Sequence, residues 1–201
     1  MAGAVLAVDQ PTVADWVARA RPFVATRGMP AQDADVVSLG LPLPPARGKR
    51  RIALQARVSE IRARRAPFEL GDCLGSAPPE WLSCLSALDQ AGRAAGIRFQ
   101  VYGSLAMQHA TGEHYLTPRS DLDLLWQASD RNRLDHGIAT LQRWQARNDL
   151  RVDGEVLLPG NLAVAWREWA ARPPRVLVKG ESAVALWPLE RCFKLFQQVP
   201  A

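Results

Sequence analysis

Cysteine, lysine and long apolar runs are scarce in this chain of 201 residues, and these shortages exclude several classes of protein. The three cysteines lie far apart, with no CxxC pair and no paired histidine, so neither a zinc site nor a disulfide framework is expected. No stretch reaches the roughly 18 apolar residues of a membrane span. The apolar start at residues 2–8 has no basic residue before it, unlike a signal peptide. We therefore expect a cytoplasmic protein in a reducing compartment.

The basic residues are 22 arginines and three lysines against 20 acids, which gives a formal net charge of +5. Coding bias can produce such an arginine-rich chain without any function. The alternative is phosphate recognition, because a guanidinium presents a planar fork of donors to phosphate oxygens. Both explanations stay open, and the charge by itself indicates only an anionic partner.

The overall composition, 48% hydrophobic and 22% charged residues, is that of a folded globular protein. Residues 1–75 predict a small N-terminal α+β domain rich in strands, and Gly71–Pro79 has the glycine, serine and proline content of a linker. Residues 76–201 predict a second domain, in which helical and strand patterns alternate. Its expected elements are helices at 79–95, 105–110 and 130–146 and strands at 97–101, 121–126, 151–158, 162–164, 175–178 and 183–186. The fold class is therefore α+β.

Two acids interrupt the apolar strand expected at residues 121–126. Asp121 and Asp123 are two positions apart, so their side chains share one face of the strand, about 6.5 Å apart along it. Like charges this close repel each other unless a divalent cation sits between them. Oxygen ligands that leave room for phosphates are the usual surroundings of Mg²⁺, so the pair is a candidate metal site.

The pair Gly103-Ser104 lies between an expected strand and an expected helix, with Ser104 as the N-cap. Glycine lets the backbone approach a ligand closely, and the N–H groups of a helix start bind phosphate. A phosphate cradle beside two carboxylates is a recurring layout for nucleotidyl transfer. Asp153, on the following strand, is a candidate third carboxylate, as metal ligand or as base. Its position before Gly154 leaves a turn residue as the alternative.

Each of these signals alone has a structural explanation. An acid-x-acid pair is more often a solvated strand end, and a Gly-Ser pair is weaker still. The complete order of strand, Gly-Ser, helix and then acid-x-acid inside an apolar strand is more specific. It favours a site for phosphoryl or nucleotidyl transfer.

This order resembles the nucleotidyltransferase superfamily of DNA polymerase beta, although sixteen residues separate Ser104 from Asp121, more than most members carry. The chain also resembles a narrower family, the phosphoribosyl-dephospho-CoA transferase of malonate decarboxylase. That resemblance rests on Tyr102-Gly103-Ser104-Leu105-Ala106, Tyr115-Leu116, Ser120-Asp121-Leu122-Asp123-Leu124-Leu125-Trp126, Gly40–Ala46, Gly48–Arg51, Asp153-Gly154-Glu155, Ala165–Glu168 and Val178-Lys179-Gly180. It implies a polymerase-beta-like domain, a mixed sheet flanked by helices, at residues 76–201.

The resemblance also implies a reaction. In that family the prosthetic group of 2′-(5-triphosphoribosyl)-3′-dephospho-CoA moves to a serine of the apo acyl-carrier subunit, a phosphodiester forms and pyrophosphate is released. Asp121 and Asp123 match the catalytic pair, which implies that they bind Mg²⁺, and Asp153 is carried over by superfamily analogy. Gly103 and Ser104 match the part that binds the donor phosphates.

A phosphate-rich donor and an acidic carrier protein would give the basic residues a role. Lys49, Arg50 and Arg51 are candidates for binding either ligand, and Lys179 for binding the triphosphate. Solvated surface charge is the alternative for each of the four.

Two other functions compete with this one. A Mg²⁺-dependent nucleotidyltransferase that adenylylates a small molecule or a protein from ATP would share the carboxylates, but the long spacer and the proline-rich N-terminal loop disfavour it. A non-enzymatic nucleic-acid-binding module is disfavoured because the tryptophans fall mostly at helical core positions instead of alternating with arginine on a strand. We therefore expect neither a nucleic acid nor a membrane as partner.

Overall fold

The computed structural model describes residues 9–26, 35–181 and 183–197, so the apolar start at 2–8 lies outside the described residues. Contacts between Cα atoms divide the chain into two units, residues 1–66 with 110–115 and residues 67–109 with 116–201. The expected boundary near residue 75 therefore falls inside the second unit. No helix within the described ranges combines the length and the apolar character that crossing a membrane requires.

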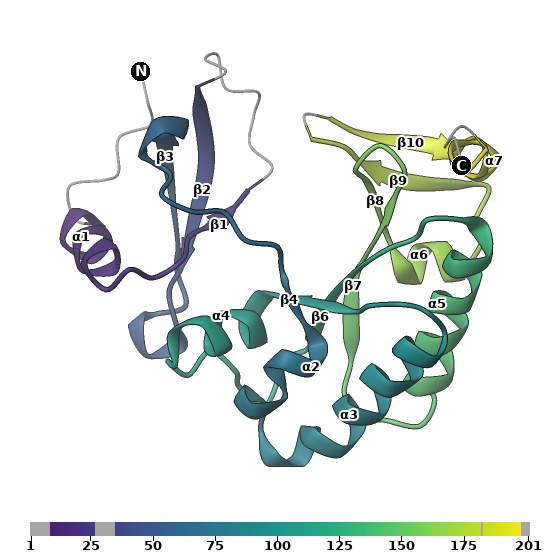
Figure 1. Ribbon diagram of the computed structural model, residues 1–201, viewed down its shortest axis with the longest axis horizontal. Coiled ribbons are helices and arrows are strands. Elements are labelled where there is room, and N and C mark those ends of the chain that lie inside the picture. Colours follow the sequence, from purple (N-terminus) through teal and green to yellow (C-terminus); the bar gives the residue numbers. More distant parts are fainter. Residues whose placement is uncertain (1–8, 27–34, 182, 198–201) are drawn as a thin grey trace. The chain divides into compact units, whose positions relative to one another are not determined.

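The N-terminal unit contains a three-stranded antiparallel sheet in the order β1-β2-β3, with α1 beside it (Figure 1). Its core includes the fully buried Trp16 of α1, whose indole N–H donates a hydrogen bond to the carbonyl of Pro22 at 3.0 Å. The prediction that the N-terminal part is rich in strands is therefore confirmed by β1, β2 and β3. The elements are α1 (Gln10–Ala18), β1 (Val24–Ala25), β2 (Val36–Pro42), η2 (Pro45–Arg47), β3 (Arg51–Arg57) and η3 (Val58–Glu60).

The second unit is built on a seven-stranded sheet in the order β10-β9-β8-β7-β6-β5-β4. β6 and β7 pair in parallel, and the other neighbouring strands are antiparallel. Parallel neighbours need a crossover connection, which α5 provides. The strands are β4 (Phe68–Glu69), β5 (Gln100–Tyr102), β6 (Leu122–Gln127), β7 (Val152–Leu158), β8 (Leu162–Ala165), β9 (Arg175–Lys179) and β10 (Val184–Pro188). The helices are α2 (Leu70–Cys73), η4 (Leu74–Ser76), α3 (Pro79–Ala94), α4 (Gly103–Thr111), α5 (Arg131–Gln145), α6 (Trp166–Ala170) and α7 (Leu189–Leu195).

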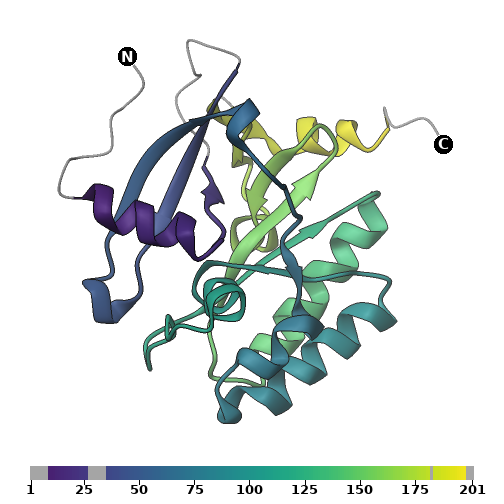
Figure 2. The same cartoon turned by 60° about the vertical axis from the view of Figure 1, so that its left-hand side comes forward.

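These elements confirm the α+β class and the mixed sheet flanked by helices. Residues alternate along β6 and β7 between a buried face and a more exposed one. Leu122, Leu124 and Val152 point into the core, which α3 and α5 cover on that side of the sheet (Figures 1 and 2). Asp123 and Asp153 occupy the intervening positions, so the acids lie on the opposite, partly exposed face.

The segment Gly71–Pro79, expected to be a linker, is part of the second unit. It contains the end of α2, all of η4 and the start of α3, and Leu70 and Cys73 are fully buried in the core. Ahead of it, β4 pairs with β5. Glycine, serine and proline indicate how flexible or restricted the backbone is locally, and they do not indicate whether a segment is buried in the fold. The composition of Gly71–Pro79 therefore wrongly predicted a linker.

A glycine on α5 allows that helix to approach the sheet closely. A Cβ at Gly137 would lie 2.7 Å from Nε1 of Trp126. Gly137→Ala should therefore reduce the free energy of unfolding by about 1 kcal/mol or more, because overpacking outweighs the better helix propensity of alanine. Urea unfolding followed by circular dichroism measures the change. Gly75→Ala is the control, since a Cβ there meets nothing within 4 Å, and equal stability of the two variants would contradict the close packing.

Candidate active site

Asp123 lies in the middle of the candidate site, on β6 between two neighbouring strands. On one side it is the register partner of Tyr102, the last residue of β5, and on the other it is the partner of Asp153 on β7. Neighbouring strands are about 4.8 Å apart, so this register sets the two aspartates side by side. Asp121, directly before β6, completes a group of three acids at one end of the sheet.

Gly103 allows the carboxylate of Asp123 to reach the start of α4. The glycine has a φ of +68°, and a Cβ built on it would stand only 1.9 Å from Oδ2 of Asp123. Both the backbone conformation and the lack of a side chain are therefore needed at this position. Ser104 lies in the first turn of α4 and not before it, because the helix begins at Gly103. The Gly-Ser pair and the Asp-x-Asp pair, separate in sequence, thus meet in the second unit.

The electrostatics of the site centre on Asp123. Burial, and then the nearby charges of Asp121 and Asp153, raise the pKa of Asp123 to about 6. Arg151 opposes this shift, and its Nη2 atom lies 3.4 Å from Oδ2 of Asp153. The carboxylate is therefore costly to ionise unless another cation approaches it.

The acids fit a divalent cation that also binds phosphate oxygens. Among the described residues, none donates a hydrogen bond to the carboxylate of Asp121 or Asp123. Within the same part of the chain, no three His, Cys, Asp or Glu side chains form a group that could hold a metal ion. Mg²⁺ commonly takes one or two protein carboxylates and completes its shell with water and substrate phosphates. Asp121 and Asp123 match that requirement, whereas a set of three protein ligands does not.

Asp153 belongs to β7, which excludes the turn that its neighbour Gly154 had suggested. The N–H of Gly154 donates a hydrogen bond to Oδ1 of Asp153 at 2.9 Å. Gly154 has a φ of +138°, and a Cβ there would lie 1.9 Å from the carbonyl oxygen of Leu124. The glycine thus lets β6 and β7 approach at the point where their acids are paired.

Two residues that the sequence did not single out hold the start of β7. The side-chain oxygen of Gln145 accepts hydrogen bonds from the N–H of Val152 at 2.9 Å and from Nη2 of Arg167 at 2.8 Å. The Arg167 guanidinium also donates to the carbonyl of Val152, at 2.7 and 3.1 Å. Both polar groups of the residue before Asp153 are therefore bound by side chains. Arg167 lies in the family motif Ala165–Glu168, which marks the residue as one to examine. No pattern in the sequence indicates that it binds the start of β7.

Lys179 does not lie beside the three acids in the sheet order. It is on β9 and forms an ion pair with Glu155 of β7, with 2.6 Å between Nζ and Oε1. Glu155 is two residues after Asp153 and shares its face of β7. Glu155 therefore already holds Lys179 near the face that carries the acids.

The other three basic candidates belong to the N-terminal unit. Arg50 forms an ion pair with the buried Asp9, at 2.6 Å from Nη2 to Oδ1. Lys49 and Arg51 are exposed, and Lys49 has a φ of +51° in the turn after η2. The three residues were grouped because they are consecutive in the sequence. Arg50 is engaged by Asp9, and Lys49 and Arg51 do not take part in that ion pair.

Comparison with known proteins assigns both parts of the chain to one family. Residues 69–190 match the model of the phosphoribosyl-dephospho-CoA transferase MdcG C-terminal domain, and residues 3–67 match that of the MdcG N-terminal domain. A phosphoribosyl-dephospho-CoA transferase of Xanthomonas euvesicatoria pv. vesicatoria is 41% identical over 92% of this chain and 86% of its own. One of Bradyrhizobium diazoefficiens is 35% identical over 90% of this chain and 79% of its own, and one of Pseudomonas putida is 31% identical over 96% and 93%.

No solved structure matches the chain. The two family models together span most of its length, and they meet between residues 67 and 69, close to the change of unit after residue 66. The expectation from the Gly-Ser and Asp-x-Asp motifs is therefore confirmed at the level of the family. The chain belongs to the phosphoribosyl-dephospho-CoA transferase family and is an enzyme, a transferase.

Proposed function

We propose that this transferase moves the prosthetic group of 2′-(5-triphosphoribosyl)-3′-dephospho-CoA to a serine of the apo acyl-carrier subunit of malonate decarboxylase. The observation that carries the proposal is the position of Asp123, beside Asp153 in the sheet and against Gly103 at the start of α4. The acids therefore lie next to a helix start, whose N–H groups can bind phosphate. Family membership supports the donor. The serine acceptor follows from the motif resemblance alone. The proposed setting is the cytoplasm, where free thiols such as these three cysteines stay reduced.

The proposed chemistry is one displacement at phosphorus. The serine oxygen forms a bond to the α-phosphorus of the donor, and the bond from that phosphorus to the oxygen bridging to the β-phosphate breaks. Pyrophosphate leaves with the bonding electron pair, and the hydroxyl proton passes to a base. The product is a phosphodiester, so the step needs no oxidant or reductant.

Each acid receives one role in this scheme. Asp121 and Asp123 would hold Mg²⁺, which when bound neutralises phosphate charge and polarises the bond to the leaving group. Asp153 accepts the serine proton, since it lies beside Asp123 and is kept in place by the Gly154 N–H and Arg151. The N–H groups at Gly103 and Ser104 bind the donor phosphates.

The basic residues divide between the two substrates. Lys179, held by Glu155, is assigned to the triphosphate. The exposed Lys49 and Arg51 are assigned to phosphate groups of the donor or to acids of the carrier, with Arg50 keeping the turn in place through Asp9. A guanidinium or ammonium in this role adds charge attraction without taking part in bond breaking.

Carrier loading tests the reaction directly. Apo carrier incubated with donor, Mg²⁺ and the enzyme should gain the mass of one prosthetic group on one serine, and pyrophosphate should appear in equal amount. A parallel incubation with ATP in place of the donor separates this reaction from adenylylation. Loading from ATP, or no gain of mass with folded components, would refute the proposed function.

Asp121→Ala and Asp123→Ala should each slow carrier loading by about 100-fold or more, because each removes a group worth several kcal/mol in the transition state. Initial rates by mass spectrometry measure the loss, with circular dichroism to verify folding. Asp149→Ala is the matched control, since Asp149 is exposed and outside the site, and it should keep near-normal turnover. A folded site variant as active as this control would remove the acids from the mechanism.

The raised pKa of Asp123 predicts a pH-dependent stability. The folded state binds this proton more tightly than the unfolded chain, in which the pKa is about 3.8, so the stabilisation is present below pH 4 and is lost as the pH rises through about 6. With a chelator present, the melting temperature of the wild type should fall across this range relative to Asp123→Asn. Adding Mg²⁺ at pH 7 should raise the melting temperature of the wild type more than that of the variant. Parallel pH profiles would contradict the shift.

A further inference from the structure

The spacer between the two halves of the motif, residues 105–120, has an unexpected place in the molecule. α4 starts at Gly103 in the second unit, yet the chain from Ala110 to Tyr115 belongs with the N-terminal unit. After Tyr115 the chain returns to the second unit and reaches Asp121 six residues later. The middle of the spacer thus belongs to the N-terminal unit, although nothing in its own pattern predicts this.

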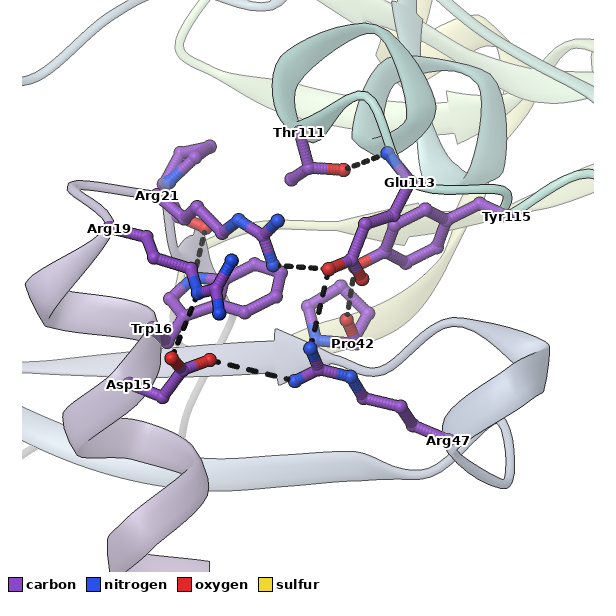
Figure 3. A network of polar contacts seen from close by, with 10 residues as sticks. Asp15, Trp16, Arg19, Arg21, Pro42, Arg47, Thr111, Glu113 and Tyr115 are labelled. Carbon is purple, nitrogen blue, oxygen red and sulfur yellow. Dashed lines mark hydrogen bonds and ion pairs between the residues drawn. The ribbon is translucent and has the colours of Figure 1, made fainter.

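Glu113 forms the main polar contact of this embedded segment (Figure 3). Its Oε1 atom lies 2.5 Å from Nη1 of Arg21 and 3.3 Å from Nη2 of Arg47. The two arginines come from separate segments, one after α1 and one in η2. The side chain of Arg21 is only 13% exposed and that of Glu113 only 23%, so removing one partner would leave the other charge largely buried and unpaired, which is costly.

Buried aromatic side chains surround this contact. The Arg21 guanidinium lies over the ring of the fully buried Trp16, 5.0 Å from its centroid. Tyr115 is 4% exposed, and its hydroxyl donates a hydrogen bond to the carbonyl of Pro42 at 2.9 Å (Figure 3). Burial raises the pKa of Tyr115 to about 12, so this hydroxyl remains a donor at any physiological pH. Two side chains of the spacer, Glu113 and Tyr115, are therefore bound to residues of the N-terminal unit.

The two ends of the spacer are bound within the second unit. The side-chain amide of Gln108 on α4 donates to the carbonyl of Ser76 at 2.6 Å, and its oxygen accepts from the N–H of Leu116 at 3.1 Å. Ser120 then closes a turn, with its N–H bonded to the carbonyl of Thr117 at 2.9 Å. The backbone is thus held on both sides of residues 110–115, directly after the Gly-Ser helix and directly before Asp121.

We propose that Glu113, through Arg21 and Arg47, is a positioning residue of the transferase: it holds residues 110–115 within the N-terminal unit and so restrains the chain that runs from the Gly-Ser helix to Asp121. This rests on the proposed function for its catalytic consequence. Glu113 is not assigned to donor or carrier here, and it acts through the backbone that joins Ser104 to Asp121. The N-terminal unit then contributes to turnover without supplying a reacting group.

The test compares Glu113→Gln with Asp15→Asn. Asp15 contacts the same Arg47, at 3.9 Å, and Arg19 at 2.8 Å, but it lies on α1 and not on the spacer. Hydrogen exchange by mass spectrometry on peptides covering residues 110–121 measures how firmly the spacer is held. Exchange there should be about tenfold faster in Glu113→Gln, as for a segment that opens locally, and unchanged in Asp15→Asn. Arg21→Met, which keeps contact with Trp16, is the second variant should Glu113→Gln fail to fold.

Carrier-loading kinetics supply the second readout. In Glu113→Gln, kcat should fall by about tenfold or more while the KM for the donor changes little, since a small displacement of reacting groups affects the chemical step. Asp15→Asn should keep the wild-type kcat. Exchange no faster than in Asp15→Asn, or faster exchange with an unchanged kcat, would overturn the inference. A wild-type enzyme that loads no carrier would refute the proposed function instead, and the exchange comparison would still decide whether Glu113 holds the spacer.

Discussion

Asp123 carries a charge that is partly withdrawn from water and faces two further acids. The charged form of such a group needs a backbone around it that does not yield, because repulsion otherwise separates the strands or keeps the acid protonated. The structure meets this requirement from three sides. Leu122 and Leu124 anchor β6 in the core, Gly103 brings the start of α4 against the carboxylate, and Gln145 with Arg167 fixes the beginning of β7. The sheet thus holds the acids close together, and a bound cation would relieve the repulsion between them.

Much of the second unit was predictable because its signals are local. The period of two along residues 121–126 and 151–158 identifies β6 and β7, and it predicts that Asp121 and Asp123 share a face, although β6 itself begins at Leu122. The register of β6 against β7 could not be predicted, since pairing between these strands depends on α5 and on the tertiary fold. Only that register shows that Asp153, predicted as a third carboxylate with a turn residue as the alternative, is the neighbour of Asp123.

The contacts that the sequence did not reveal are side chain to backbone or cross long sequence distances. Gln145 and Arg167 bind peptide groups, which carry no residue signature, and Glu113 binds an arginine 92 residues away. The prediction of a linker at Gly71–Pro79 was wrong for a related reason. Cys73, and Leu70 just before the segment, are buried by core residues from distant parts of the chain. Many arginines follow the same principle. Arg93 and Arg98 pair with Glu69, and Arg133 donates to the carbonyl of Gly96, so these arginines have partners within the chain although their side chains are exposed.

The chain passes between its two units three times, after residues 66, 109 and 115. Joining two independent genes end to end produces a single passage. Here the six residues that return to the N-terminal unit are encoded in the middle of the catalytic region, so the two parts are interleaved and not merely consecutive. A fragment ending at residue 66 lacks Glu113 and leaves Arg21 without its buried partner, and the catalytic fragment keeps six residues with no surface to pack on. Cutting the chain at residue 66 therefore removes this contact from both parts of the enzyme.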